Sequence, residues 1–111
     1  MTQTEGTIVR TWSATADAAG TRNYSRYFDG TLLPELRKVP GFNGACLLRR
    51  ELGEDGTAEL TAHTFWASHE AIRAFAGDDI TVSVVEPEAQ AMLLDFDRTA
   101  IHHSLVVDAR D

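Results

Sequence analysis

The sequence predicts an α+β fold, a ferredoxin-like split βαβ sandwich with a four-stranded antiparallel sheet. Segments with the composition of strands alternate with segments of helical spacing in the order β-α-β-β-α-β. Residues 53–56, Gly-Glu-Asp-Gly, form a turn that joins the two middle strands as a hairpin. The length of 111 residues indicates a single domain, residues 1–111.

The first strand is expected over residues 7–12, which apart from Arg10 are β-branched or aromatic and contain neither Gly nor Pro. Residues 13–20 are small and polar, so we expect them to connect this strand to a helix. Four residues spaced at i, i+3, i+4 and i+7 indicate that helix. They are Tyr24, Tyr27, Phe28 and Thr31.

The first helix is expected to stop near Gly30, which is a plausible C-terminal cap. Leu33 precedes a proline, and this position disfavours α geometry. Pro34 then begins a second short helical piece over residues 34–39, because proline is tolerated at the first helical position.

Further along the chain, strands are expected over residues 43–52 and 57–66. The second long helix is expected over residues 68–76, with Ser68 as its N-terminal cap. An irregular connection over residues 78–86 precedes a short helix, 87–95, and a last strand, 98–108. Both long helices then lie on one side of the sheet. The other face is left bare, and a bare apolar face favours a homodimer through the sheet.

Composition excludes several classes of partner. The net charge of −7 argues against nucleic acid, whose phosphates attract clustered Lys and Arg. No apolar run reaches the ~20 residues of a membrane span. Residues 1–6 show no secretory signal, so the expected location is cytoplasmic. A single Cys, and the lack of nucleotide-binding or metal-spaced motifs, predict that no cofactor is needed.

Four segments carry a resemblance to a known family: residues 39–42, Val-Pro-Gly-Phe; residues 48–51, Leu-Arg-Arg-Glu; residues 65–77; and residues 101–105, Ile-His-His-Ser-Leu. They resemble the antibiotic biosynthesis monooxygenase-like group of the dimeric α+β barrel superfamily. The resemblance implies two sheets packed face to face, with a pocket in each subunit between its sheet and helices. It also implies that Trp66 lines this pocket. His102 recurs in uncharacterised members, many of which carry Tyr where this chain has His103.

The monooxygenase members oxidise an anthrone-type phenol without flavin, haem or metal. The resemblance therefore implies a cofactor-independent monooxygenase acting on a small aromatic or polyketide substrate. One alternative is a haem-binding or haem-degrading protein, although residues 78–86 lack the His that haem-degrading relatives place there. Another is a ligand-binding dimer without catalysis.

Several side chains are candidates for the site. Tyr24 and Tyr27 face the sheet by helical period, and Asn23 is a possible hydrogen-bond donor to a ligand carbonyl. Trp66 either lines the pocket or caps the core. Arg10 either pairs with a ligand oxyanion or forms a salt bridge with an acidic neighbour. The candidate catalytic residues, His102 and His103, are adjacent in a strand, so only one of them reaches the pocket.

Overall fold

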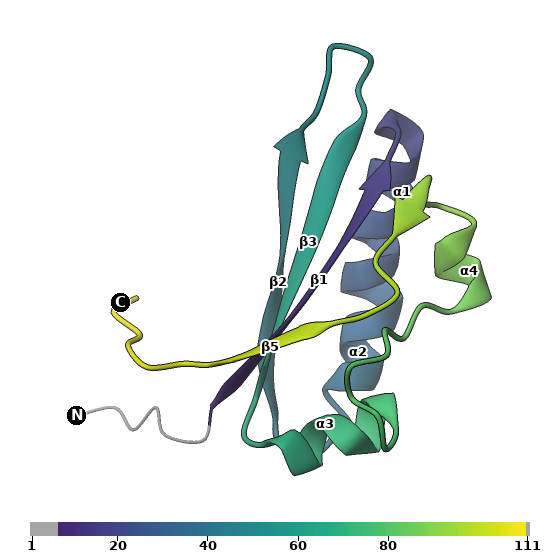
Figure 1. Ribbon diagram of the computed structural model, residues 1–111. Helices are drawn as coiled ribbons and strands as arrows, with labels where there is room; N and C mark the ends of the chain where they lie inside the picture. The colour runs from purple at the N-terminus through teal and green to yellow at the C-terminus, as the bar shows by residue number, and fades with distance from the viewer. Residues whose placement is uncertain (1–6, 111) are drawn as a thin grey trace.

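A computed structural model describes residues 7–110 and confirms the α+β fold with an antiparallel sheet (Figure 1). Residues 1–6, on which the expectation about a secretory signal rests, lie outside this range. The elements are β1 (Ile8–Ala16), α1 (Ala18–Tyr27), the π-helical turn η1 (Phe28–Leu32), α2 (Leu33–Leu36), β2 (Phe42–Glu51), β3 (Ala58–Trp66), α3 (His69–Ala76), α4 (Pro87–Gln90), β4 (Asp95–Phe96) and β5 (Ile101–Ser104).

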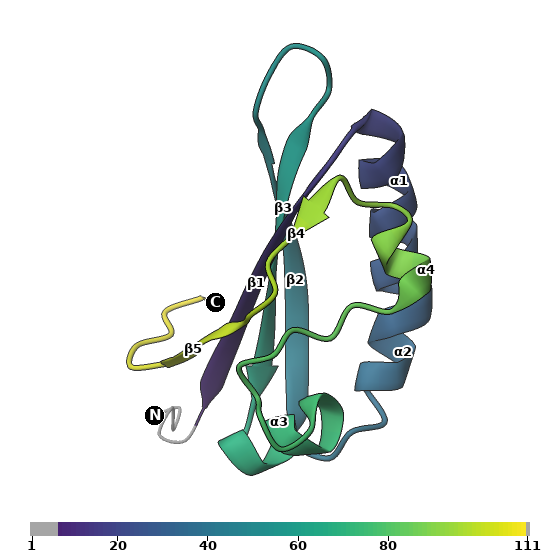
Figure 2. The ribbon, with the colours of Figure 1, turned by 45° about the vertical axis from the view of Figure 1, so that its right-hand side comes forward.

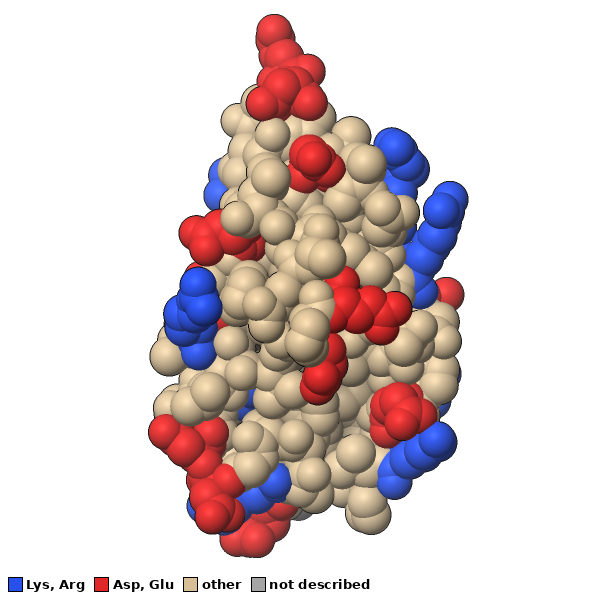
Figure 3. Space-filling model, turned by 90° about the vertical axis from the view of Figure 1, so that its right-hand side faces the viewer, with Lys and Arg blue, Asp and Glu red and all other residues tan. Residues whose placement is uncertain are grey.

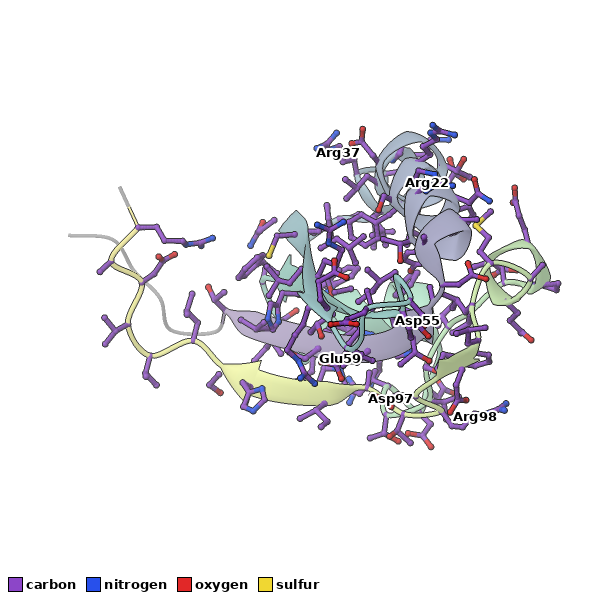
Figure 4. All side chains as sticks on the ribbon, turned by 90° about the horizontal axis from the view of Figure 1, so that it is seen from above. Arg22, Arg37, Asp55, Glu59, Asp97 and Arg98 are labelled. Carbon is purple, nitrogen blue, oxygen red and sulfur yellow. The ribbon has the colours of Figure 1, made fainter. Side chains whose placement is uncertain are left out.

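The sheet has the strand order β2-β3-β1-β4, and β5 also pairs with β1. Every pairing is antiparallel. β1 and β3 pair along their whole length, from Ile8 opposite Trp66 to Ala16 opposite Ala58. The helices cover one face of this sheet and leave the other face free of helices (Figure 2). Seen from above, Arg22 and Arg37 lie in the helical layer, away from the sheet (Figure 4).

Side chains alternate between the two faces of the sheet, as period two requires. In β3 the residues at even positions are buried under the helices, and Leu60 and Trp66 are among the largest fully buried side chains. His63 is half-buried on the opposite face, as the alternation predicts. The register and alternation place these residues on the face without helices: Val9, Thr11, Cys46, Leu48, His63, Phe65, Ile101 and His103.

The first strand is longer than expected. Ser13–Ala16 continue β1, so the prediction of a connection over residues 13–20 is wrong for this part. The small side chains of Ala14 and Ala16 are buried and allow α1 to approach the sheet. Asp17 caps α1 by accepting a hydrogen bond from the amide of Gly20 at 2.7 Å. A Cβ at position 20 would lie 2.2 Å from the carbonyl oxygen of Met92, so this close approach requires glycine.

The predictions that the first helix ends near Gly30 and that Leu33 is not helical are also wrong. The chain stays helical from Ala18 to Leu36 because η1 connects α1 to α2. Leu33 has helical angles, φ −58° and ψ −44°, and its amide donates to the carbonyl of Phe28, five residues back. This wider turn precedes Pro34, which has no N–H to donate, so the helix passes the proline without losing a regular hydrogen bond there.

The C-terminal third differs from the expectation in two places. The short helix ends at Gln90, because the Leu94 amide donates to the carbonyl of Thr15 and returns the chain to β1. The expected strand over residues 98–108 is split into β4 and β5. Residues 98–100 pair instead with residues 81–83, including an isolated bridge between Val82 and Thr99. Within residues 7–110, no helix is long and apolar enough to cross a membrane.

Candidate functional site

Two adjoining cavities lie beside the long helix. The inner one lies between the sheet and the helices, and the outer one lies between the long helix and residues 84–89. The outer cavity has a volume of about 460 Å³ and the inner one about 50 Å³. The outer volume falls within the range of about 300–1,000 Å³ that is typical of small-molecule sites. Four residues line both cavities: Tyr24, Leu32, Phe75 and Val84. The outer cavity is further lined by Tyr27, Thr31, Glu35, Val85, Glu86, Pro87, Glu88 and Ala89, and the inner one by Arg10, Trp12, Phe28, Leu36, Ala62, Thr64 and Ser83.

Strands β1 and β3 form the floor of the inner cavity, and the helix that includes η1 forms its roof. Aromatic rings dominate the lining. The ring of Tyr24 lies 6.0 Å from that of Trp12 and 6.2 Å from that of Phe28, measured between centroids. Residues 83–86 and the start of α4 close the side. Such a site suits a flat, largely apolar ligand.

The guanidinium of Arg10 forms the polar end of the inner cavity. Arg10 is only 5% exposed. It donates hydrogen bonds to the backbone carbonyls of Ile80 and Val82 and to Nε2 of His102, the last at 2.9 Å. Within residues 7–110, no carboxylate lies within salt-bridge distance of Arg10. The salt bridge that was one alternative for Arg10 is therefore not found among these residues.

This environment leaves the positive charge of Arg10 without an anion among the described residues. Burial lowers the pKa of its guanidinium, because desolvation disfavours the charged form. A buried cation is costly unless it is paired, and hydrogen bonds to neutral carbonyls compensate only in part. The end of the cavity at Arg10 is therefore suited to an anionic oxygen of a ligand.

His102 lies directly opposite Arg10 in the register between β1 and β5, on the helical side of the sheet. A guanidinium only donates hydrogen bonds, so Nε2 of His102 must accept, and the imidazole is neutral with its proton on Nδ1. Burial, and then the charge of Arg10, lower the pKa of His102. The ring of His69 is nearby, 6.2 Å away between centroids. His103 is exposed on the opposite face, so the structure brings only His102 to this side.

Tyr24 is 4% exposed and lines both cavities. The hydroxyl of Tyr24 makes no hydrogen bond within residues 7–110. Its oxygen is not completely enclosed by protein atoms. Burial, and then Tyr27, raise the pKa of Tyr24, so this hydroxyl keeps its proton and can donate it to a ligand. Tyr27 lines the outer cavity, as its helical spacing predicts.

Trp66 and Asn23 lie elsewhere. Trp66 is fully buried and lines neither cavity; its Nε1 donates to the hydroxyl of Thr64 at 2.8 Å. Its ring packs against Phe42 and Phe75, with centroids 5.2 and 5.8 Å away. Of the two alternatives for Trp66, core packing describes its surroundings. Asn23 lines neither cavity but a shallow groove that adjoins the outer cavity and shares Tyr27, Thr31 and Glu88 with it.

Three aromatic residues of the lining were not among the candidates from sequence, namely Trp12, Phe28 and Phe75. Trp12 lies on the same face of β1 as Arg10, and its Nε1 donates to the carbonyl of Asp97 at 2.8 Å. The shared parity of residues 10 and 12 was the available signal. Phe75 belongs to the apolar side of α3. Its position over the cavity depends on how α3 docks, which periodicity alone does not give.

Among residues 7–110, no group of three or more His, Cys, Asp or Glu side chains is arranged to hold a metal ion. The candidate site therefore consists of Arg10, its positioning partner His102, and an aromatic cavity that includes the free hydroxyl of Tyr24.

The chain matches no protein-family model, and no curated protein matches it. It does resemble solved structures along almost its whole length. A protein of Bacillus cereus, described as a candidate antibiotic biosynthesis monooxygenase, aligns at a TM-score of 0.61 with 18% identity, over 93% of this chain and 98% of that one. The monooxygenase ActVA-Orf6 of Streptomyces coelicolor, in complex with nanaomycin D, aligns at 0.59 with 20% identity, over 96% and 92%.

The haem degrader MhuD of Mycobacterium tuberculosis, with two haems bound in its active site, aligns at 0.58 with 22% identity, over 93% of this chain and 99% of that one. At these identities the comparisons show a shared fold and nothing more. The resemblance found in the sequence is confirmed at that level: this chain has the fold of the antibiotic biosynthesis monooxygenase-like proteins.

Proposed function

We propose that this protein binds a planar aromatic molecule with an acidic hydroxyl group and oxidises it with dioxygen, without a resident cofactor. The observation that carries the proposal is the buried guanidinium of Arg10, which borders an aromatic cavity and has no carboxylate partner among residues 7–110. The shared fold with a monooxygenase that was solved with nanaomycin D supports the same substrate class.

In this proposal the rings of the substrate lie in the outer cavity. The inner cavity, at about 50 Å³, is much smaller than the outer one, so in this proposal it receives a substituent of the ring system. An oxygen of the substrate reaches Arg10 there. The cation stabilises the ionised form of that oxygen and so favours loss of the proton that starts the reaction. The hydroxyl of Tyr24 is available to donate a second hydrogen bond.

The reaction balances without an additional reductant. An anthrone loses a proton to become an enolate, and the enolate supplies the electrons that reduce dioxygen. One oxygen atom enters the ring carbon as a carbonyl. The other oxygen atom combines with the two hydrogens that the CH₂ group loses and leaves as water. The contribution of the protein is to orient the substrate, stabilise the enolate and exclude solvent.

His102 is proposed as a positioning residue, because it holds Arg10 and lines neither cavity. No role at this site is proposed for His103, which lies on the opposite face of the sheet.

We also propose that two copies associate through the sheet face that lacks helices. Leu48 and Ile101 on this face are 48% and 60% exposed. Large exposed apolar side chains on one face are typical of an interface. A ferredoxin-like protein from an uncultured marine organism, described as dimeric, aligns at a TM-score of 0.60 with 11% identity.

A haem does not fit this cavity well. None of the residues that line the two cavities is His or Cys. Tyrosinate is another haem ligand. However, the pKa values of Tyr24 and Tyr27 are both raised, which disfavours the ionised form. Incubation with haemin should therefore give no new Soret band. A stoichiometric band would favour the haem alternative over this proposal.

The proposal is tested by oxygen uptake with dithranol, an anthrone, measured above its spontaneous oxidation. The wild-type protein should accelerate uptake, and Arg10→Met should reduce that acceleration at least ten-fold while keeping the fold. His103→Gln is the matched control and should retain the wild-type rate. Binding of dithranol without oxygen uptake would support the non-catalytic ligand-binding alternative instead.

A further inference from the structure

We propose that the outer cavity selects ligands that carry a positive charge at its mouth. The preferred ligand would be an aromatic molecule with an acidic oxygen at one end and a protonated amine at the other. This inference rests on the proposed function and specifies its substrate class.

The charged residues that line the outer cavity are all acidic: Glu35, Glu86 and Glu88. Glu35 is paired with Lys38 at 2.8 Å, which offsets its charge. Neither Glu86 nor Glu88 forms a salt bridge within residues 7–110. Both residues are exposed, and acidic side chains lie near the middle of the molecular face that carries α4 (Figure 3). The mouth therefore carries two carboxylates that have no ion-pair partner within residues 7–110.

These charges act on groups inside the cavity. Tyr27 is 8% exposed, and its pKa is raised first by burial and then by Glu86 and Glu88. A second, independent feature also indicates a ligand in the same space. Tyr24, 4% exposed, presents a hydroxyl without a partner among residues 7–110 to both cavities. The acidic residues thus line the mouth of a cavity that also contains the Tyr24 hydroxyl, which makes no hydrogen bond within residues 7–110.

The two ends of the combined cavity have opposite charge. Arg10 lies at the inner end, whereas Glu86 and Glu88 lie at the outer end. A ligand of matching polarity gains favourable electrostatic interactions at both ends. A carboxylate at the outer end is repelled, which gives discrimination between ligands rather than additional affinity for all of them.

The experiment compares two fluorescent probes that share one ring system. 9-(Aminomethyl)anthracene is a cation at pH 7.5, and 9-anthracenemethanol is neutral and of nearly equal size. Dissociation constants are measured by fluorescence for the wild type, for the double variant Glu86→Gln/Glu88→Gln and for Glu54→Gln. The last is the matched control, because Glu54 lies in the β2–β3 hairpin and lines neither cavity.

The wild type should bind the amine about five-fold more tightly than the alcohol at low salt, since exposed charges contribute modestly. The preference should shrink in 0.5 M NaCl and fall close to one in the double variant, while Glu54→Gln retains it. Equal affinity for both probes in the wild type, or a preference that survives the double variant, would overturn the charge selection and leave the proposed function intact. Failure of both probes to bind would count against the proposed function itself.

Discussion

Arg10 and His102 lie directly opposite each other on β1 and β5, and the guanidinium donates a 2.9 Å hydrogen bond to Nε2 of the imidazole. The bond exists only while His102 is neutral, because a protonated imidazole has no acceptor. Protonation would place two cations side by side in a partly buried location. The position of Arg10 in the cavity and the protonation state of His102 are therefore linked.

The first prediction concerns pH. The pKa of His102 in the folded protein lies below its ordinary value of 6.5, chiefly because of burial and then because of Arg10. As the pH falls below about 6.5, the unfolded chain takes up this proton first, so the stabilising contribution is complete above that pH and is lost toward the folded pKa. Urea unfolding at pH 7.5 and 5.5 should show a larger loss of stability for the wild type than for His102→Gln.

An NMR titration gives a direct check on the same link. The imidazole signals of His102 should titrate below pH 6.5 in the wild type. In Arg10→Met the midpoint should rise, because a neighbouring cation no longer disfavours the imidazolium. A midpoint that does not move between the two proteins would show that Arg10 has no influence on this histidine.

The second prediction concerns Trp66, which is fully buried and packs against Phe42 and Phe75. Trp66→Ala should lower the free energy of unfolding by about 3–5 kcal/mol, the usual cost of removing a large core aromatic. Trp12→Phe, a change at a half-buried ring, should cost much less. Urea denaturation followed by circular dichroism measures both. A cost below about 1 kcal/mol for Trp66→Ala would contradict core packing.

The third prediction uses the two tryptophans as separate reporters. Trp12 lines the inner cavity, whereas Trp66 lines neither. With 1,8-dihydroxyanthraquinone as a stable ligand, the emission maximum should shift in Trp66→Phe, where Trp12 is the remaining tryptophan. It should stay in place in Trp12→Phe. Wavelength is the better measure, because energy transfer to the ligand quenches both residues. The opposite pattern would place the ligand beside Trp66.

The sequence predicted those features that depend on local periodicity. Alternation along β1 and β3 requires only an extended backbone, so the sequence was enough to group strand residues by face, such as Arg10 with Trp12. Helical spacing likewise directed Tyr24 and Tyr27 toward the sheet. The order of elements and the hairpin at residues 53–56 followed from composition and turn residues, and together they were sufficient for the fold class.

The errors arose where distant segments determine the structure. Pro34 does not interrupt the helix because η1 widens the turn before it, and this cannot be recognised from a proline rule. The last strand is split because residues 98–100 pair with residues 81–83. The same irregular segment provides the carbonyls of Ile80 and Val82 that hold Arg10. A segment without periodicity gives no local signal of such contacts, so the setting of Arg10 required the structure.

The last prediction tests association through the open sheet face. Sedimentation at micromolar concentration should give about twice the chain mass of 12.2 kDa. Leu48→Asp should shift the protein toward the monomer, because a carboxylate buried at an apolar interface loses its hydration without gaining a partner. Leu94→Asp is the matched control: Leu94, 62% exposed, precedes β4 and lies outside that face. A wild-type protein that sediments as a monomer, or equal behaviour of the two variants, would contradict this interface. Since both cavities form within one chain, ligand binding should survive in a folded Leu48→Asp monomer.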